Sequence, residues 1–393
     1  MKVLITGMGI ITAVGTGTDE TLAALKSGRS GMDVVRRFDT AHRHIPVCEV
    51  KQSNGELRDM SGIPSDKRYC SRTALLGLIA ARQAMRSSHS KTAGRRIGLV
   101  NATTTGGMDY HEVHYRKMSS GDVCAQEVEL LDCAGGTHLI ADVLGITDNV
   151  TTVSTACSSS ANAILTGVRM IRNGLADKVL AGGSDALTRF TLNGFNTLEI
   201  LSPTGCRPFD ANRNGITLGE GAAYVVLESE KTALPDDILC EVSGYANVSE
   251  AYHQTSSSPD GEGAAMAVRK ALSVAGLSPD DIDYIHAHGT GTQVNDLSEG
   301  RAVESVFRNR TPPLSSTKGS TGHTLAAAGS AGAIISVLAI REQLLFAGAG
   351  FHRPMPELSF QPNTLLRQAT INHVLSNSFG FGGSNTSLIF SRY

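Results

Sequence analysis

A cysteine stands where a strand-like run of residues gives way to a helix-like one. Cys157 follows the β-branched stretch 150–155 and precedes a helical pattern over 158–171. The free N–H groups and the positive dipole end of a helix start favour a thiolate. We therefore expect Cys157 to be a nucleophile with a lowered pKa. The alternative is a buried structural cysteine, which is the commoner fate of this residue type.

Two histidines lie in turns rich in glycine and threonine. His288 follows the apolar strand pattern 282–286, and His323 precedes a pattern over 325–345 that is apolar all round and predicts a buried helix. Burial and the positive helix end disfavour an imidazolium, so we expect a neutral His323 that donates an N–H. A capping or packing histidine is the alternative for His323. For His288 the alternatives are a structural histidine whose hydrogen bonds are all satisfied, or a His-x-His metal pair. We discount the metal site because no third ligand has a recognisable spacing.

Two further segments could serve such a site. Lys318 lies in an apolar-flanked loop and is either an ion-pair partner or a surface residue. Residues 380–385, which include Gly380, Phe381 and Gly382, form a glycine-rich turn between two predicted strands, 372–376 and 386–390. Its N–H groups could face a developing oxyanion, or it could be a plain hairpin loop. Gly7-x-Gly9 does not have the spacing of a dinucleotide-binding motif.

The elements that must position these residues predict an α/β fold. Strand and helix patterns alternate along the chain, which favours mostly parallel sheets covered by helices. We expect the short first strand to end at the glycines after residue 5. A charged segment at 228–237 suggests two halves, 1–235 with the cysteine and 236–393 with both histidines. Residues 154–157 and 316–319 each follow a strand and precede an Ala-rich helix, which suggests a duplication.

Composition excludes several classes of protein. The chain has 393 residues, with 35 Lys+Arg against 37 Asp+Glu and a net charge of -2, so no basic excess points to nucleic acid. No apolar stretch reads as a membrane span, and the first residues do not read as a secretory signal. Seven cysteines without a CxxC pair indicate neither a disulfide framework nor a zinc site. We expect a cytoplasmic protein.

Taken together, these segments resemble the β-ketoacyl-acyl carrier protein synthases of types I and II, in the thiolase superfamily. The resemblance spans essentially the whole chain. Its specific motifs are Thr-Ala-Cys at 155–157, Ala-His-Gly-Thr-x-Thr at 287–292 and Ser-Thr-Lys-x-x-Thr-Gly-His at 316–323. A further block combines Arg-Pro-Phe-Asp at 207–210 with Gly-Glu-Gly-Ala at 219–222.

The resemblance implies a thiolase-like fold with two duplicated halves in five layers, αβαβα, and usually a homodimer. It implies a Cys-His-His site, matched here by Cys157, His288 and His323, and a family lysine, matched by Lys318. It makes Phe381 the gate of the pocket. It places substrate contacts at these residues: Thr290, Thr292, Phe379, Phe195 and Thr105.

The implied reaction is a decarboxylative Claisen condensation. The cysteine takes an acyl chain from acyl carrier protein, and malonyl carrier then loses CO₂ and attacks that chain. The N–H groups of Cys157 and Phe381 would hold the tetrahedral oxyanion, and the two histidines would stabilise the enolate. No metal or redox cofactor is implied, since both substrates are carried on the phosphopantetheine arm of the carrier.

Some features separate this chain from near relatives or depart from the family pattern. No cysteine follows Cys240, unlike in degradative thiolases, and the third site position is a histidine, unlike in type III synthases. The nucleophile is present, which argues against a non-catalytic partner subunit of a heterodimer, the alternative function. Nothing in the sequence marks the orienting group of a cysteine hydrolase. Gly332 stands where the family has a glutamate.

Two expectations concern the substrates. Residues 101–107 carry hydroxyls, including that of Thr105, where the family tends to have aliphatic side chains. We therefore expect a polyketide-like or polyene-forming enzyme that takes polar, rigid or unsaturated chains. The acidic carrier would dock on Lys67, Arg68 and Arg72, although a solvated helix start explains these charges equally well.

Overall fold

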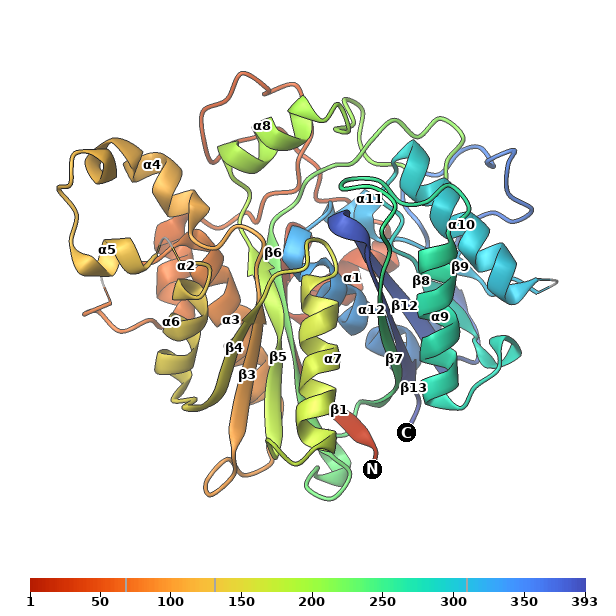
Figure 1. Ribbon diagram of the computed structural model, residues 1–393, viewed down its shortest axis with the longest axis horizontal. Helices are drawn as coiled ribbons and strands as arrows, with labels where there is room; N and C mark the ends of the chain where they lie inside the picture. The colour runs from red at the N-terminus through yellow and green to blue at the C-terminus, as the bar shows by residue number, and fades with distance from the viewer. Residues whose placement is uncertain (68, 131, 309) are drawn as a thin grey trace.

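Strands and helices alternate along the whole chain of the computed structural model, which describes residues 1–67, 69–130, 132–308 and 310–393 (Figure 1). The elements up to residue 229 are β1 (Val3–Thr12), β2 (Gly15–Thr16), α1 (Thr18–Ser27), α2 (Asn54–Ser61), α3 (Arg72–Arg86), β3 (Ile97–Ala102), α4 (Met108–Ser119), α5 (Ala125–Glu129), α6 (Gly135–Leu144), β4 (Asp148–Val153), α7 (Ser159–Arg172), β5 (Lys178–Asp185), α8 (Arg189–Thr197) and β6 (Gly221–Ser229).

The later elements follow a 3₁₀ turn at Pro235–Asp237. They are β7 (Cys240–Ser249), α9 (Glu262–Ala275), β8 (Tyr284–His286), α10 (Gln293–Phe307), β9 (Leu314–Ser315), α11 (Lys318–Thr321), α12 (Ala328–Glu342), β10 (Leu344–Leu345), β11 (Arg367–Gln368), β12 (His373–Gly380) and β13 (Ser384–Ser391).

The main sheet repeats one pattern in its two halves. Its strand order is β4-β3-β5-β6-β1-β7-β13-β12-β8-β9, and the halves meet where β1 pairs with β7. In the first half β3 is parallel to β4 and β5, whereas β6 is antiparallel to β5 and β1. In the second half β8 is parallel to β9 and β12, whereas β13 is antiparallel to β12 and β7. This equivalence confirms the predicted duplication.

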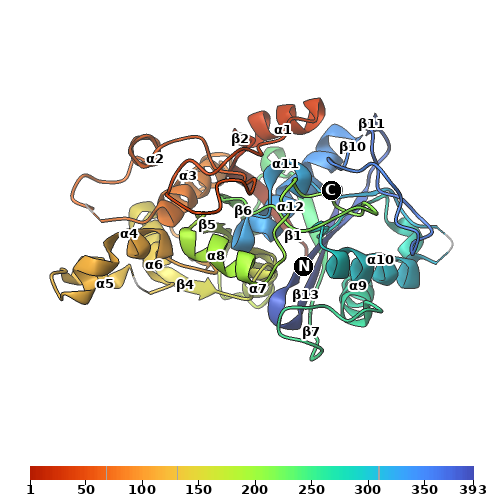
Figure 2. The ribbon, with the colours of Figure 1, turned by 90° about the horizontal axis from the view of Figure 1, so that it is seen from above.

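Helices cover both outer faces and fill the space between the halves. α3 packs on one face of the first half, and α9 with α10 packs on the outer face of the second half. α7 and α12 pack against each other between the two half-sheets, as the two views show (Figure 1, Figure 2). The five-layer αβαβα arrangement is therefore confirmed. The apolar stretch Leu325–Glu342 is long enough to cross a membrane, but 83% of it is buried inside the protein, as in a core helix.

The expectation of mostly parallel sheets was wrong. Each half ends in antiparallel strands, because β12 and β13 form a hairpin and β6 returns beside β5 after a long excursion. The glycines after residue 5 do not end the first strand either. A Cβ on Gly7 would lie 2.3 Å from the carbonyl oxygen of Ala84, and one on Gly9 would lie 2.0 Å from that of Ala80. These glycines let helix α3 approach the strand closely.

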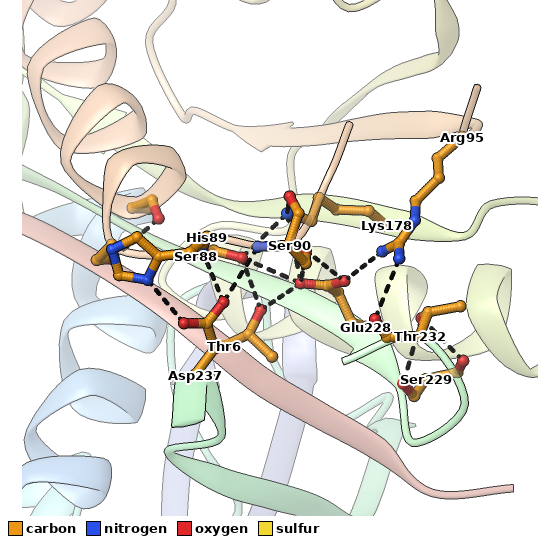
Figure 3. Close-up of polar contacts among 12 residues, drawn as sticks. Thr6, Ser88, His89, Ser90, Arg95, Lys178, Glu228, Ser229, Thr232 and Asp237 are labelled. Atoms are coloured by element: carbon orange, nitrogen blue, oxygen red, sulfur yellow. Dashed lines mark hydrogen bonds and ion pairs between the residues drawn. The ribbon is translucent and has the colours of Figure 1, made fainter. Parts of the chain in front are cut away.

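A buried polar network ties the end of the first half together (Figure 3). The carboxylate of Glu228 and the ammonium of Lys178 lie 3.4 Å apart, and both side chains have no exposed surface. The same carboxylate accepts hydrogen bonds from three hydroxyl groups and pairs with one guanidinium; these groups belong to Thr6, Ser88, Ser90 and Arg95. Next to it, Asp237 in the connection between the halves accepts bonds from the backbone N–H groups of His89 and Ser90. The connection is thereby fixed to the first half.

Candidate active site

Cys157 lies in a tight turn between β4 and α7. Its side chain is buried, and the helix begins two residues later at Ser159. Ala156, the residue before it, has a φ of 50°, which is a strained backbone conformation for an L-residue with a side chain. The backbone N–H of Thr155 donates to the Ser159 hydroxyl at 2.8 Å. The sequence prediction of a sharp strand–turn–helix site is confirmed.

The thiol of Cys157 is less acidic than the sequence suggested. Burial raises its pKa to about 11, which outweighs the opposing effects of the Lys318 charge and of the backbone N–H groups of Phe381 and Cys157. The predicted lowering of this pKa was wrong, because the helix start lies inside the protein instead of at its surface. The resting nucleophile is therefore a neutral thiol.

The nucleophile and the two histidines converge. The Sγ of Cys157 and a ring nitrogen of each of His288 and His323 all lie within 4.8 Å of one another. The two imidazole rings are 5.4 Å apart between centroids and nearly perpendicular, at 85°. Residues up to 166 positions apart thus share one point in space, although β4 and the pair β8 and β9 lie at opposite ends of the strand order. The two halves pack around α7, which follows Cys157, and α12, which follows His323, and this packing brings the site residues together.

The protonation of His323 follows from its surroundings. Its Nδ1 accepts a hydrogen bond from the backbone N–H of Leu325 at 3.0 Å, so the proton of the neutral ring is on Nε2. Among the described residues, Nε2 has no hydrogen-bond partner. Burial and the nearby Lys318 charge hold the pKa of His323 well below its ordinary value. The predicted neutral histidine with a free N–H is confirmed.

Lys318 orients His288. Its Nζ donates to the backbone oxygen of His288 and lies 3.3 Å from Nδ1 of the same residue. A lone pair on Nδ1 facing the ammonium leaves the proton on Nε2, as in His323. Burial and then the Lys318 charge hold the pKa of His288 well below its ordinary value. Both rings can therefore present an N–H to one ligand atom.

Two buried carboxylates on α10 shape the His288 turn, and sequence reasoning missed both. Glu299 accepts the backbone N–H groups of His288 and Gly289, at 2.9 and 2.8 Å, and burial raises its pKa to about 7. Asp296 accepts the backbone N–H of Thr290 at 2.9 Å. Their signal was a pair of acids three residues apart, directly after a turn of glycines and threonines whose N–H groups needed acceptors.

The glycine-rich turn lies directly against the nucleophile. A Cβ on Gly380 would lie 2.8 Å from the carbonyl oxygen of Thr155 and 3.2 Å from the nitrogen of Cys157. The ring of Phe381 stacks on that of Phe195, with centroids 5.9 Å apart and planes at 19°. Gly382 is exposed at the tip, with a φ of 78°. The turn is thus a wall of the site and not a remote hairpin.

A cavity of about 520 Å³ opens onto this group. Most of the predicted site residues line it: Cys157, His288, His323, Thr290, Thr292, Phe195, Phe379, Gly380 and Phe381. Thr105 is not among the lining residues, and its hydroxyl donates to buried Asp185 at 3.4 Å. Thr103 and Thr104 also donate to Asp185, so these hydroxyls hold a buried acid and do not make a polar pocket wall.

The three residues expected to dock a carrier have different fates. Arg72 is buried, its guanidinium paired with Glu220 at 2.7 Å, so its assignment to a docking surface was wrong. The sequence pattern missed its partner, which lies 148 residues away. Lys67 is partly exposed and pairs with Asp142 at 3.2 Å. Arg68 lies outside the described residues.

A thiol and two imidazoles are also a donor set that Zn²⁺ can use. His323 could bind an ion only through Nε2, because Nδ1 accepts the Leu325 N–H, and binding would remove the Nε2 proton. The geometry fits organic chemistry at a thioester better, since two neutral N–H donors and one nucleophile face the same cavity.

Comparison with known proteins places the chain among condensing enzymes. Residues 1–233 match the family described as beta-ketoacyl synthase, N-terminal domain, and residues 239–352 match beta-ketoacyl synthase, C-terminal domain. The chain is 32% identical to 3-oxoacyl-(acyl-carrier-protein) synthase 2 of Staphylococcus aureus strain MRSA252, covering 100% of this chain and 99% of that protein. It is 34% identical to the protein of the same name from Coxiella burnetii, covering 100% and 98%.

Solved structures agree. The ishigamide ketosynthase/chain length factor has a TM-score of 0.91 at 32% identity and covers 100% of this chain and 99% of that one. The ketosynthase ApeO, solved in complex with its chain length factor ApeC from Xenorhabdus doucetiae, has a TM-score of 0.86 at 32% identity, with 100% and 98% covered. A type II polyketide ketosynthase complex with its acyl carrier protein has a TM-score of 0.87 at 27% identity, with 100% and 99% covered.

Proposed function

This chain belongs to the β-ketoacyl synthase family, and from that premise we propose that it catalyses the decarboxylative condensation of malonyl-acyl carrier protein with a cysteine-bound acyl chain. The observation that carries the proposal is the meeting of one thiol and two neutral N–H donors within 4.8 Å at a cavity. A non-catalytic subunit would not need this convergence, so that alternative is not favoured.

The first half-reaction transfers the acyl group. Cys157 attacks the thioester carbonyl of the acyl carrier, and the backbone N–H groups of Cys157 and Phe381 hold the tetrahedral oxyanion. These two N–H groups already favour negative charge on the Cys157 sulfur, which supports their placement at the reacting centre. The carrier thiolate leaves with the proton that the cysteine gives up, so acyl-carrier and thiol become acyl-enzyme and carrier thiol.

The second half-reaction forms the carbon–carbon bond. His288 and His323 donate from Nε2 to the thioester oxygen of the malonyl carrier, which stabilises the enolate as CO₂ departs. The enolate carbon attacks the acyl-Cys157 carbonyl and expels the Cys157 thiolate, which takes up one proton. Thr290 and Thr292 line the cavity on the side of α10, and we assign them to the phosphopantetheine arm. Phe379 and the stacked pair Phe195 and Phe381 border the acyl chain.

We further propose that the chain works in the cytoplasm as half of a dimer. Strand β4 lies at the outer edge of the main sheet with several residues partly exposed, so one row of its backbone groups is open to pairing. Two of the solved neighbours are ketosynthases with a chain length factor. Mass measurement by light scattering of the chain alone, and with a co-expressed homologous subunit, distinguishes a homodimer from a heterodimer.

The test of activity is reconstitution. Purified chain, acyl carrier and malonyl carrier are combined, and CO₂ release and the acyl-enzyme mass are measured. Cys157→Ala should abolish the acyl adduct and condensation, whereas Cys124→Ser, a change at an exposed cysteine, should leave both unchanged. Condensation by Cys157→Ala at the wild-type rate would refute the assignment.

The acyl chain is tested by competition. We propose a polyketide-like or polyene-forming role with unsaturated or rigid chains. The likeness to a type II polyketide ketosynthase supports the polyketide part of this proposal. The binding of Thr103, Thr104 and Thr105 to Asp185 removes the polar-pocket reason for this proposal. Carriers loaded with saturated and polyunsaturated chains of equal length are offered together. Equal or preferred use of saturated chains would remove the proposal.

A further inference from the structure

A third histidine is buried behind the two in the site. His286 ends strand β8, two residues before His288, and only 5% of it is exposed. Its Nε2 lies 3.2 Å from the hydroxyl of Thr317, and among the described residues its Nδ1 has no hydrogen-bond partner. Burial and the Lys318 charge lower its pKa to about 3, so the ring is neutral.

The hydrogen-bond partner of His286, Thr317, directly precedes Lys318 in the chain. Thr317 caps the short helix α11, where its carbonyl oxygen accepts the backbone N–H groups of Ser320 and Thr321 at 2.8 and 2.9 Å. Lys318 is the first residue of that helix, and its Nζ bonds to His288. A continuous chain of contacts therefore runs from His286 through Thr317 and Lys318 to His288.

Gly332 on α12 makes room for the His286 ring. A Cβ at this position would lie 3.0 Å from Nδ1 and 3.1 Å from Cε1 of His286, and 3.1 Å from the hydroxyl of Ser376. A larger side chain at 332 would have to push the imidazole toward Thr317. Gly332 stands where the family has a glutamate, and the His286 ring occupies the space next to the glycine. The glycine and the buried imidazole therefore depend on each other.

The electrostatic surroundings of Lys318 also fit a role for His286 in holding this side chain in place. The side chain of Lys318 is buried, and among the described residues it forms no ion pair, although the charge of Glu299 acts to raise its pKa. A neutral imidazole beside its helix holds it in place without neutralising it. Burial lowers the pKa of Lys318, and its ammonium in turn acts to lower the pKa values of Cys157, His288 and His323.

We propose that His286, packed on Gly332, is a positioning residue that sets Lys318 through Thr317 and thereby orients His288. This inference rests on the proposed function only for its activity readout. Its second readout, the reactivity of the Cys157 thiol, does not require any condensation activity.

The test compares two amides. In His286→Gln the amide group reaches the place of Nε2 and can still bond to Thr317, whereas in His286→Asn it reaches only the place of Nδ1. We expect His286→Asn to lower kcat for condensation about tenfold with KM changed less than about twofold, as loss of one orienting hydrogen bond implies. His286→Gln should stay within about threefold of wild type.

The second readout is alkylation of Cys157 by iodoacetamide over a pH series, followed by intact mass. With Lys318 displaced, His286→Asn should alkylate more slowly than wild type at each pH, and His286→Gln should match wild type. Equal behaviour of Asn and Gln variants in both assays would overturn the proposal. If wild type alkylates normally but does not condense, the proposed function fails and the alkylation comparison still decides this one.

A variant on the opposite side of the contact covers the case in which His286→Asn does not fold. Gly332→Ala keeps every polar group and adds one methyl against the ring. We expect slower alkylation of Cys157 and a lower kcat, in a protein whose melting temperature falls by only about 5 °C. Wild-type alkylation and wild-type kcat in folded Gly332→Ala would overturn the proposal.

Discussion

Changing His323 to asparagine removes one N–H from the site while keeping the contact that fixes the side chain. In the protein, Nδ1 of His323 accepts the Leu325 N–H at 3.0 Å, and Nε2 faces the site without a partner. The amide oxygen of asparagine occupies about the place of Nδ1 and can accept the same N–H. Nothing in His323→Asn reaches the place of Nε2, so the donor alone is lost.

The magnitude follows from the role of that donor. Removing one preorganised donor from an oxyanion site costs about 10²–10³ in kcat, or about 2.7–4 kcal/mol of transition-state stabilisation. The loss should fall on decarboxylation of malonyl carrier, where negative charge develops on the thioester oxygen. Transfer of the acyl group to Cys157 uses the N–H groups of Cys157 and Phe381, so it should change by less than about threefold.

The assay separates the two half-reactions. Acyl-enzyme formation is followed by intact mass with acyl carrier alone, and decarboxylation by CO₂ release with malonyl carrier. His323→Gln is the matched control, because its amide nitrogen reaches the place of Nε2 but leaves the buried Leu325 N–H unpaired, at a stability cost of about 1–3 kcal/mol. If His323→Asn releases CO₂ at a rate within about threefold of the wild-type rate, the assigned tautomer and the role of His323 are refuted.

Three further predictions concern the Cys157 thiol, the glycine-rich turn at Gly380 and the buried network around Glu228. Alkylation of Cys157 should rise with pH toward about 11, because burial raises the pKa above that of a free thiol, and an apparent value below that of a free thiol would contradict this. Gly380→Ala should slow acyl-enzyme formation more than about tenfold in a folded protein, since its methyl would lie 2.8 Å from the Thr155 oxygen, and an unchanged rate would show that the turn can yield. Glu228→Gln should lower the free energy of unfolding in urea by about 3–5 kcal/mol, because it removes the carboxylate that pairs with buried Lys178 and with Arg95. Adding Lys178→Met should recover most of that loss, and a double variant no more stable than Glu228→Gln would argue against the pair.

The sequence predicted the site better than its electrostatics. Thr-Ala-Cys at 155–157, His288 and His323 each follow a strand, and the family resemblance predicted that the three residues share one site. Strand order alone does not bring them together, because β4 and the pair β8 and β9 lie at opposite ends of the sheet. The pKa of Cys157 was not readable, because it depends on how much water the second half excludes from the helix start. An argument from the helix dipole alone, without the effect of burial, predicted a lowered pKa for Cys157, whereas burial raises it.

Long-range pairing explains the other errors. Arg72 looked like a surface charge at a helix start, but its guanidinium meets Glu220, and no local pattern reveals a partner so distant. Gly7 and Gly9 looked like a turn, and only the packing of α3 shows them to be places where a helix touches a strand. Thr105 was assigned to the pocket by position, and its hydroxyl found the buried acid Asp185 instead.

The reacting groups of the site are neutral at rest, so the first anion beside them is the one that the reaction itself forms. At rest the thiol and both imidazoles are neutral, because burial opposes a thiolate and an imidazolium alike. Glu299 lies close by, but its oxygens are occupied by the backbone N–H groups of the His288 turn, and burial raises its pKa to about 7. Burial also lowers the pKa of Lys318, because among the described residues its ammonium forms no ion pair with a carboxylate. A buried cation is costly unless an anion joins it, and the oxyanion and the enolate are the anions that form beside it. The electrostatic environment of the site therefore stabilises the anionic transition states more than the resting enzyme. Such a difference is the condition for a large effect on kcat.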